Sequence, residues 1–427
     1  MQGVDSTDMR VLLLSQFYPP VIGGEERHVR NLGAALAARG HQVSLATQRS
    51  QGANECELDG DVRVHRLGGT LQRVSALFAD RERPHAPPFP DPELMLGLYR
   101  CLSKEKPDII HAHNWLLHSF LPLKRVFGTP CVVTLHDYGL ICAKKNFMHK
   151  GAPCSGPALA KCLVCATQHY GAIKGGITTM ANWAAGFVER LTVDKFLAVS
   201  HAVARFNDLD KSGVPFEVIP NFVPNNISDL TLESDPRLKQ LPEEYILFVG
   251  DLSRQKGVDI LVKAYARLDA APPLVLIGRR CPDTPTDLPE NVHLFASWPH
   301  ATVMHAWSRC LFGVAASVWP DPCATVIMEA MAQAKPMIVT DIGGMPDLVN
   351  DNETGLVVPA GDVGALADAL TILLGSSDLR QRMATASLAK VEQLKATPIV
   401  ARIEEVYRQL VSPDIARHRA ADAHAVP

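Results

Sequence analysis

The stretch Trp319-Pro320-Asp321-Pro322-Cys323-Ala324-Thr325-Val326-Ile327-Met328-Glu329-Ala330-Met331-Ala332 places two acidic residues, Asp321 and Glu329, around the start of a helix. Its two prolines exclude a helix at the beginning of the stretch, because proline lacks an N–H group and restricts the residue before it. From Thr325 onward the apolar residues recur at helical spacing. The first N–H groups of such a helix have no partner within it and attract anions. The stretch therefore predicts either a site where a diphosphate lies on the helix start while the carboxylates bind hydroxyl groups, or a buried helix with a capped start.

The same stretch resembles a motif of one enzyme family, the retaining nucleotide-sugar glycosyltransferases with two Rossmann-like domains (GT-B), which include bacterial mannosyl- and glucosyltransferases. In that family the segment usually reads Glu-x-Phe-Gly-x-x-x-x-Glu-Ala-Met-Ala. The second half matches fully, whereas Asp321 stands at the first acid and Cys323-Ala324 at Phe-Gly. The resemblance implies that Asp321 binds the donor sugar and Glu329 the nucleotide ribose. The residues that it places around the donor phosphates are Cys323, Ala324, Thr325 and Val326.

Composition narrows the class of protein. A chain of 427 residues is too long for one hydrophobic core, so we expect two domains. With 47% hydrophobic and 20% charged residues the chain is globular, and a net charge of −3 gives no reason to expect nucleic acid as a partner. We find no signal peptide and no run of about 20 apolar residues. We therefore expect a cytoplasmic protein, either free or at the inner face of the membrane, with ten reduced cysteines.

Apolar runs of strand length alternate with helix-length segments in two series along the chain. The first series begins at Met9–Gln16 and the second at Tyr245–Gly250. Repeated strand–helix units of this kind favour an α/β fold with parallel, doubly wound sheets. We expect a first domain over residues 1–222 and a second over residues 223–396. The resemblance implies that the two Rossmann-like domains face a central cleft, and that a helix at about 397–411 returns to the first domain.

Glycine-containing turns follow the first strand of each series. Gly23 and Gly24 indicate either a plain tight turn or a close approach of the backbone to a ligand. The resemblance favours the latter, since the family has a Gly-Gly loop here that faces the donor phosphate and the acceptor.

The second turn is Gly250-Asp251-Leu252-Ser253-Arg254-Gln255-Lys256-Gly257, and the family pattern is Gly-Arg-Leu-x-x-x-Lys-Gly. Lys256 would bind the diphosphate as a point charge. Because Asp251 replaces the usual arginine, we expect Arg254 to supply the second positive charge.

Histidines end two of the expected strands of the first domain. In parallel sheets ligands bind beyond the carboxyl ends of the strands. A histidine at such a place is either a structural residue with its hydrogen bonds satisfied or part of the site. The resemblance favours a functional role for His136, beside the sugar and the acceptor, with a weaker claim for His113.

The segment Tyr138–Val188 contains no Asp, Glu or Arg but five lysines: Lys144, Lys145, Lys150, Lys161 and Lys174. Such a segment attracts an anionic surface or substrate, unless acids from elsewhere in the fold balance it. Within it Ile177, Met180, Trp183 and Phe187 follow a helical spacing. This apolar stripe indicates either core packing or contact with a membrane interface.

Four cysteines of the same segment, Cys142, Cys154, Cys162 and Cys165, have the spacing C-x11-C-x7-C-x2-C. A Cys-x2-Cys pair with two further thiols suits tetrahedral zinc in a reducing compartment. The alternative is four thiols without a metal. We expect no cofactor for catalysis itself, and hypothesise a structural zinc.

The sequence therefore predicts a retaining glycosyltransferase that moves a sugar from a nucleotide-sugar donor to a glycan, lipid-linked or small-molecule acceptor. Its expected catalytic residues are His136, Arg254, Lys256, Asp321 and Glu329. Two alternatives stay open. One is a disaccharide phosphorylase or sugar-phosphate synthase on the same scaffold, and the other is an idle sugar-nucleotide-binding or scaffold protein.

Overall fold

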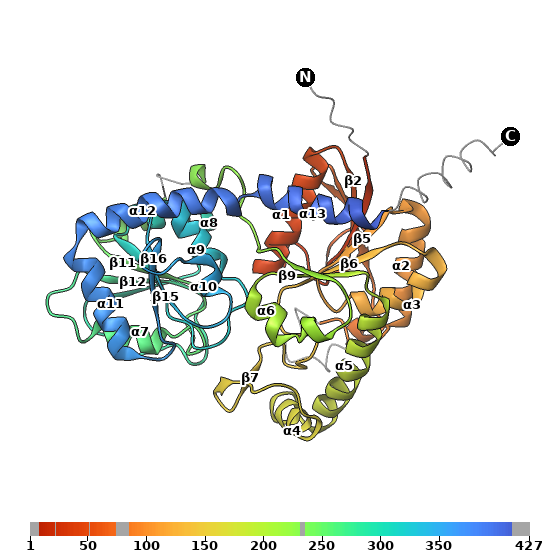
Figure 1. Ribbon diagram of the computed structural model, residues 1–427, viewed down its shortest axis with the longest axis horizontal. Helices are drawn as coiled ribbons and strands as arrows, with labels where there is room; N and C mark the ends of the chain where they lie inside the picture. The colour runs from red at the N-terminus through yellow and green to blue at the C-terminus, as the bar shows by residue number, and fades with distance from the viewer. Residues whose placement is uncertain (1–7, 22, 51, 74–84, 231–234, 412–427) are drawn as a thin grey trace.

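The computed structural model describes residues 8–21, 23–50, 52–73, 85–230 and 235–411, which form two α/β domains side by side (Figure 1). Each domain is built on one mainly or wholly parallel sheet, with helices on its faces. The predicted fold class is therefore confirmed. The apolar runs form the strands because parallel strands are buried on both faces.

The first sheet has the strand order β10-β9-β6-β5-β1-β2-β4-β3. All neighbouring strands are parallel except β3, which pairs with β4 in the antiparallel direction. The central strand β1 lies between β2 and β5, with Val11 opposite Val43 on one side and Ile109 on the other. The strands are β1 (Arg10–Leu14), β2 (Gln42–Gln48), β3 (Cys56–Asp59), β4 (Val62–Leu67), β5 (Ile109–Ala112), β6 (Cys131–Leu135), β9 (Lys195–Ala198) and β10 (Phe216–Val218).

Helices and a small hairpin complete the first domain. Asp91 caps α2 by accepting hydrogen bonds from the N–H groups of Glu93 and Leu94. The helices are α1 (Gly24–Ala38), α2 (Pro92–Glu105), α3 (Leu117–Phe127), α4 (Leu159–Tyr170), α5 (Ala172–Thr192) and α6 (His201–Phe206). The hairpin strands β7 (Met148–His149) and β8 (Ala152–Pro153) lie with α4 and α5 between β6 and β9 in the chain, and this insertion projects from the sheet (Figure 1).

The second sheet has the strand order β13-β12-β11-β14-β15-β16, all parallel. Its strands are β11 (Ile246–Val249), β12 (Leu274–Gly278), β13 (Val292–Ala296), β14 (Phe312–Ala315), β15 (Met337–Thr340) and β16 (Gly355–Val358). The helices are α7 (Val258–Tyr265), α8 (His300–Arg309), α9 (Thr325–Ala332), α10 (Met345–Leu348), α11 (Val363–Gly375) and α12 (Ser377–Val391). No helix of the described chain is both long and apolar enough to cross a membrane.

The chain passes between the domains twice, and the two passages are hydrogen-bonded to each other. The N–H of Val223 donates to Leu394 O at 3.1 Å, and the N–H of Ala396 donates back to Val223 O at 2.9 Å. Helices α12 and α13 (Ala396–Leu410) then lie along one side of the molecule, where α13 returns to the first domain beside α1 (Figure 1). The side chains of Val400 and Tyr407 are fully buried in the first-domain core.

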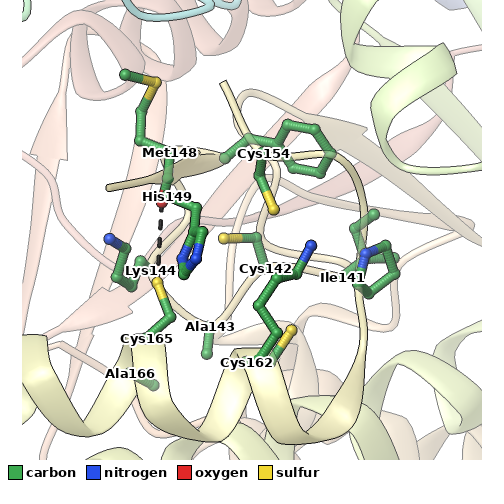
Figure 2. Close-up of a pocket in the computed structure, with 13 residues that line it drawn as sticks. Ile141, Cys142, Ala143, Lys144, Met148, His149, Cys154, Cys162, Cys165 and Ala166 are labelled. Carbon is green, nitrogen blue, oxygen red and sulfur yellow. Dashed lines mark hydrogen bonds between the residues drawn. The ribbon is translucent and has the colours of Figure 1, made fainter. Parts of the chain in front are cut away.

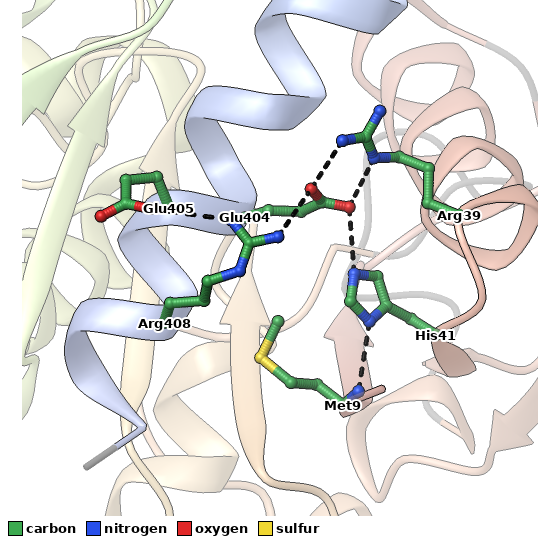
Figure 3. Close-up of polar contacts among 6 residues, drawn as sticks. All are labelled: Met9, Arg39, His41, Glu404, Glu405 and Arg408. Carbon is green, nitrogen blue, oxygen red and sulfur yellow. Dashed lines mark hydrogen bonds and ion pairs between the residues drawn. The ribbon is translucent and has the colours of Figure 1, made fainter. Parts of the chain in front are cut away.

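A buried carboxylate fixes α13 in this position (Figure 3). Glu404 accepts hydrogen bonds from Arg39 at 2.5 and 2.8 Å and from His41 Nε2 at 3.0 Å, while the backbone N–H of Met9 donates to His41 Nδ1 at 3.2 Å. Burial alone would raise the pKa of Glu404, but the hydrogen bonds from Arg39 and His41 outweigh it and hold the pKa below its usual value. The last described helix is thereby tied to the first strand and helix of the chain.

Helix α5 has the reverse of the usual amphipathic arrangement. Its buried side consists of small and polar residues, and Gly175 lies so close to α4 that a Cβ there would be 2.5 Å from Ala166 O. Its large apolar residues face outward, with exposed fractions from 54% to 81% at Ile173, Ile177, Met180, Phe187 and Leu191. The interpretation of this stripe as core packing is therefore wrong.

Candidate functional site

Loops at the carboxyl ends of the two sheets meet between the domains. Tyr138, which follows β6, donates its hydroxyl hydrogen to Pro320 O at 2.6 Å, across from the loop after β14. The N–H of His201, at the start of α6, donates to Asp347 Oδ2 at 2.8 Å. In open α/β sheets ligands bind at the carboxyl ends of the strands. Most of the donor-site and catalytic residues predicted from the sequence lie on these loops or on α9, which follows one of them.

Two of them are in direct contact. Lys256 Nζ forms an ion pair with Asp321 Oδ2, although the residues lie 65 positions apart in the chain. Asp321 is buried, with 5% of its surface exposed, and Lys256 also lies 5.5 Å from the ring of Trp319. The loop after β11 thus supplies the positive charge, and the loop after β14 supplies the carboxylate that meets it.

Glycines allow these loops to come so close. Gly257 has a φ of 72°, and a Cβ there would lie 1.7 Å from Ala316 O, so only glycine fits. The N–H of Gly344 donates to Asp321 O at 2.7 Å, and a Cβ on Gly344 would lie 2.1 Å from Pro322 O. The loop that carries Asp321 is therefore held from both sides by glycine backbone.

Glu329 lies on α9, one turn after the helix start. It is buried, and its Oε1 is 2.8 Å from His300 Nε2. At the helix start the N-cap residue Ala324 makes no side-chain hydrogen bond to the first turn. The capped start that the sequence left open is thus absent from this helix, so that no side chain of the N-cap competes for its first N–H groups.

The residues around the helix start are closely packed. Cys323 and Ala324 are buried, and Thr325 and Val326 are half-buried. Burial raises the pKa of the Cys323 thiol to about 12, opposed by the backbone N–H of Asn221 from the first domain. Cys323 is therefore a protonated packing residue between the domains at neutral pH.

The other expected phosphate ligands are placed differently. Arg254 is exposed, and in the described structure its guanidinium forms no hydrogen bond or ion pair with Lys256, Asp321 or Glu329. Asp251 is paired with Arg279, at 2.8 and 3.1 Å. Gly250 packs against β12, since a Cβ on Gly278 would lie 1.6 Å from Gly250 O.

On the first-domain side His136 belongs to a cluster of imidazoles. His113 Nδ1 and His136 Nε2 are hydrogen-bonded at 3.0 Å, and the ring of His28 lies 5.0 Å from that of His136. Burial lowers the pKa of His28 to about 4 and those of His113 and His136 well below the usual value. The cluster is therefore neutral at pH 7.

Within the described residues, His28, His113 and His136 form the only group of three His, Cys, Asp or Glu ligand atoms that lie within 4.8 Å of one another. A metal ion there would have to replace the hydrogen bond between His113 and His136, which already uses one nitrogen of each ring. A fourth imidazole continues the row inward, because His111 stacks on His113 at 4.2 Å and is hydrogen-bonded to Tyr407 at 2.6 Å. The arrangement is a packed group of imidazoles in which the hydrogen bond with His113 orients His136.

A small cavity of about 20 Å³ lies beside His136, lined among others by Asn114, Trp115, Asp137 and Lys145. Lys145 Nζ is 4.0 Å from the Trp115 ring and 3.8 Å from the Asp137 carboxylate. The cavity thus combines an aromatic face with charged and amide groups, which are the groups that bind the faces and hydroxyls of small polar ligands.

The Gly-Gly loop lies close to this cavity. Gly23 is the N-cap of α1, and a Cβ on Gly24 would meet no atom within 4 Å, so open space adjoins the loop. Glu25 follows, half-buried, and accepts a hydrogen bond from Asn114. Burial, with the charge of Glu26, raises the pKa of Glu25 to about 8. Glu25, Asn114 and His28 were not singled out from the sequence, since only the fold brings them near His136.

Two family models match the chain. The model of glycosyl transferases group 1 matches residues 231–389, and that of glycosyltransferase family 4 matches residues 22–226. Glycogen synthase from Mycobacterium tuberculosis is 24% identical over 407 residues, which are 89% of each chain.

Two solved structures share the fold at low sequence identity. Sucrose-phosphate synthase from Thermosynechococcus elongatus has a TM-score of 0.71 and 21% identity, covering 94% of this chain and 98% of that one. HepE from Anabaena, in complex with UDP-glucose, has a TM-score of 0.64 and 17% identity, covering 94% and 100%. The two family models together account for both domains, as does the alignment with glycogen synthase. The chain therefore belongs to the group 1 glycosyltransferases, with a first domain of the family 4 type.

Proposed function

We propose that the protein transfers a sugar from a nucleotide-sugar donor to an acceptor with retention of the anomeric configuration. The observation that carries the proposal is the Lys256–Asp321 ion pair at the uncapped start of α9, with Glu329 one turn further along. A cation and free N–H groups suit a diphosphate, and carboxylates suit the hydroxyls of ribose and sugar. The relative HepE, whose structure is of a complex with UDP-glucose, supports this class of donor.

The ion pair suggests how the donor would engage the site. Lys256 and Asp321 neutralise each other in a largely buried place. A diphosphate would draw the ammonium group of Lys256 towards its oxygens, and Asp321 would then accept hydrogen bonds from the sugar. Charge grows on the phosphate oxygens as the sugar–phosphate bond breaks, so the free N–H groups and Lys256 would stabilise the transition state more than the bound donor.

His136 and the polar groups that line the small cavity beside it would contact the acceptor. Because the imidazole is neutral, it can accept or donate a hydrogen bond at the sugar without adding charge. The contacts of Tyr138 with Pro320 and of His201 with Asp347 hold the two domains together around this place. Such closure would exclude water and so limit hydrolysis of the donor.

The test is a panel of UDP-, GDP-, ADP- and dTDP-sugars, measured first by thermal shift and then by release of the nucleoside diphosphate. A hundredfold excess of the right donor over its dissociation constant should stabilise the fold by about 2.7 kcal/mol. Proton NMR of the product then reads the anomeric configuration. A donor that binds without transfer or hydrolysis would favour the idle binding protein, activity with inorganic phosphate or a sugar phosphate as acceptor would favour the phosphorylase or synthase, and an inverted product would contradict retention.

We also propose that the acceptor is presented at an anionic membrane. The outward apolar row of α5, formed by Ile173, Ile177, Met180, Phe187 and Leu191, gives an amphipathic helix that suits insertion between lipid headgroups. Lys145 is paired with Asp137, but residues 138–188 hold four further lysines and no acid. This charge suits anionic lipids rather than a second copy of the same basic segment.

Liposome flotation tests this part. Binding should need anionic lipid, weaken at high salt and fall in Ile177→Ser with Phe187→Ser. The matched control is Ile372→Ser, which changes an exposed apolar residue of α11 in the second domain. Equal binding to neutral and anionic liposomes, or no binding by the parent protein, would contradict the proposal.

A further inference from the structure

Four cysteines, spread over residues 142–165, line one cavity of about 30 Å³ in the insertion of the first domain. Cys142 lies in the loop after β6, Cys154 follows β8, and Cys162 and Cys165 lie on α4. Figure 2 shows the sulfur atoms of Cys142 and Cys154 turned towards each other above α4, which brings Cys162 and Cys165 to the same cavity. The irregular spacing in the sequence therefore becomes a single cluster of thiols in the fold.

The surrounding structure has little else to hold it. Helix α4 runs for 12 residues, yet Ala166 is its only buried one. The hairpin strands β7 and β8 are two residues each. Helices of this length gain most of their stability from packing, and an isolated hairpin is at best marginally stable.

The loop backbone is also strained. Lys145, Phe147 and Lys150 have φ values of 64°, 53° and 51°, in the left-handed region. Each such residue costs on the order of 1 kcal/mol or more, and persists only when neighbouring structure fixes it. A restraint at the four cysteines would supply that fixation.

Three of the four sulfurs have weak backbone contacts. The thiol of Cys154 donates to Gly156 O at 3.5 Å, and that of Cys165 donates to Met148 O at 3.9 Å (Figure 2). The N–H of Ala158 donates to Cys162 Sγ at 3.4 Å. Binding of a metal ion, which needs the deprotonated sulfur, would replace these weak contacts.

The charge of the segment is complementary to a metal–thiolate centre. One Zn²⁺ with four thiolates has a net charge of −2. Residues 138–188 hold five lysines and no acid, and Lys144 and Lys161 line the cavity itself. A centre of charge −2 would thus be balanced from within the segment, at little cost from repulsion.

We propose that Cys142, Cys154, Cys162 and Cys165 bind one structural zinc ion, which joins the loop and hairpin to α4. Four thiols lose four protons, and the four sulfurs bind Zn²⁺ as a closed tetrahedral site. Neighbouring sulfurs would then lie about 3.8 Å apart, from Zn–S bonds of about 2.3 Å. No three of these sulfurs lie within 4.8 Å of one another in the described structure, so the bound form requires rotation about the Cα–Cβ bonds.

Metal analysis of the full-length protein, purified without chelator, tests the proposal. We expect one zinc per chain in the parent, and loss of most of it in Cys162→Ser and in Cys165→Ser. Cys56→Ser and Cys281→Ser, outside the cluster, are the matched controls and should keep the metal. Cobalt(II) in place of zinc should give the visible absorption of a tetrahedral thiolate site in the parent and the controls.

A second measurement keeps the test valid if the variants fail to fold. In the native parent, thiol reagent should spare the four cysteines until a chelator is added, and the chelator should speed proteolysis within residues 138–171. A parent protein without metal that takes up no added zinc would overturn the proposal, as would iron with inorganic sulfide, or a disulfide between Cys142 and Cys154. Donor binding measured on the same samples shows independently whether the sugar-nucleotide site is intact.

Discussion

At the scale of single residues, the contact between Lys256 and Asp321 makes a direct prediction. Lys256→Ala should lower transfer on the order of 100-fold or more, because on the proposed mechanism the leaving diphosphate would lose the cation that binds it. Steady-state kinetics with varied donor measures this. Lys263→Ala, on the exposed side of α7, is the control and should leave the rate unchanged. Unchanged kinetics in Lys256→Ala would remove the phosphate role from this residue.

His136 allows a prediction of the opposite kind. His136→Ala should depress transfer while leaving the affinity for the nucleoside diphosphate intact, since His136 lies on the first domain, whereas Lys256 and Glu329, the expected ligands of the nucleotide, lie on the second. Calorimetry with UDP or GDP and a transfer assay separate the two effects. His305→Ala, on α8, is the control. The role beside the sugar is wrong if nucleotide affinity falls as far as transfer does.

At this scale the sequence predicts best where function depends on a short motif. Lys256, Asp321 and Glu329 were selected from motifs, and the fold brings Lys256 to Asp321. His300, which pairs with Glu329, and His28, which lies against His136, were not selected. His300 and Glu329 are 29 positions apart and His28 and His136 are 108 apart, so no local sequence pattern predicts either contact. Their roles in the reaction stay predictions.

At the scale of elements, the close crossing of α4 and α5 can be tested through glycine. In Gly175→Val the new Cβ would lie 2.5 Å from Ala166 O and from the Thr167 backbone, so the helices should move apart. We expect faster proteolysis of residues 138–171 and a lower midpoint of thermal unfolding. Gly176→Val is the matched control, because a Cβ there meets no atom within 4 Å. Equal rates of proteolysis in the two variants would show that the close contact between α4 and α5 does not stabilise α4.

Strands were predictable because burial on both faces requires an unbroken apolar run, as in Val11–Leu14. The exposure of the apolar side of α5 was not predictable from the sequence. Its spacing identifies an apolar face, but the same spacing describes a face covered by the core and a face left bare. Only the small residues opposite, such as Gly175 and Gly186 against their neighbours, reveal which side packs.

At the scale of the whole molecule, the buried imidazoles predict sensitivity to mild acid. The pKa of His28 is about 4 and that of His111 about 3, against 6.5 when unfolded. As the pH falls below 6.5 the unfolded chain binds protons that the native state excludes, so the contribution of these histidines to stability is complete above 6.5 and declines towards pH 4. Glu25, with its pKa raised to about 8, acts in the opposite direction. Below pH 8 the native state holds one proton on Glu25 that the unfolded chain has lost, so this contribution to stability grows as the pH falls.

Denaturant unfolding at pH 7.5, 6.5 and 5.5 measures the effect. Each buried histidine should change the folding equilibrium constant by up to about tenfold per pH unit below 6.5. His28→Phe, which keeps an aromatic ring against Phe222, should reduce the slope by one proton. The same slope in parent and variant would mean that His28 titrates normally in the folded state.

The return of α13 to the first domain also affects the order in which the protein can fold during synthesis. Residues up to 222 leave the ribosome first, but their core lacks Val400 and Tyr407, and Arg39 and His41 lack the carboxylate of Glu404. At about 5–20 residues per second, synthesis of the intervening 185 residues takes roughly 10 to 40 s. During that interval the nascent first domain exposes the apolar side chains of α1 that later pack against α13. The second domain, in contrast, receives its last strand, β16, before α13 is made. The domain made first is thus the domain completed last, and its nascent form is the state that a chaperone would have to protect.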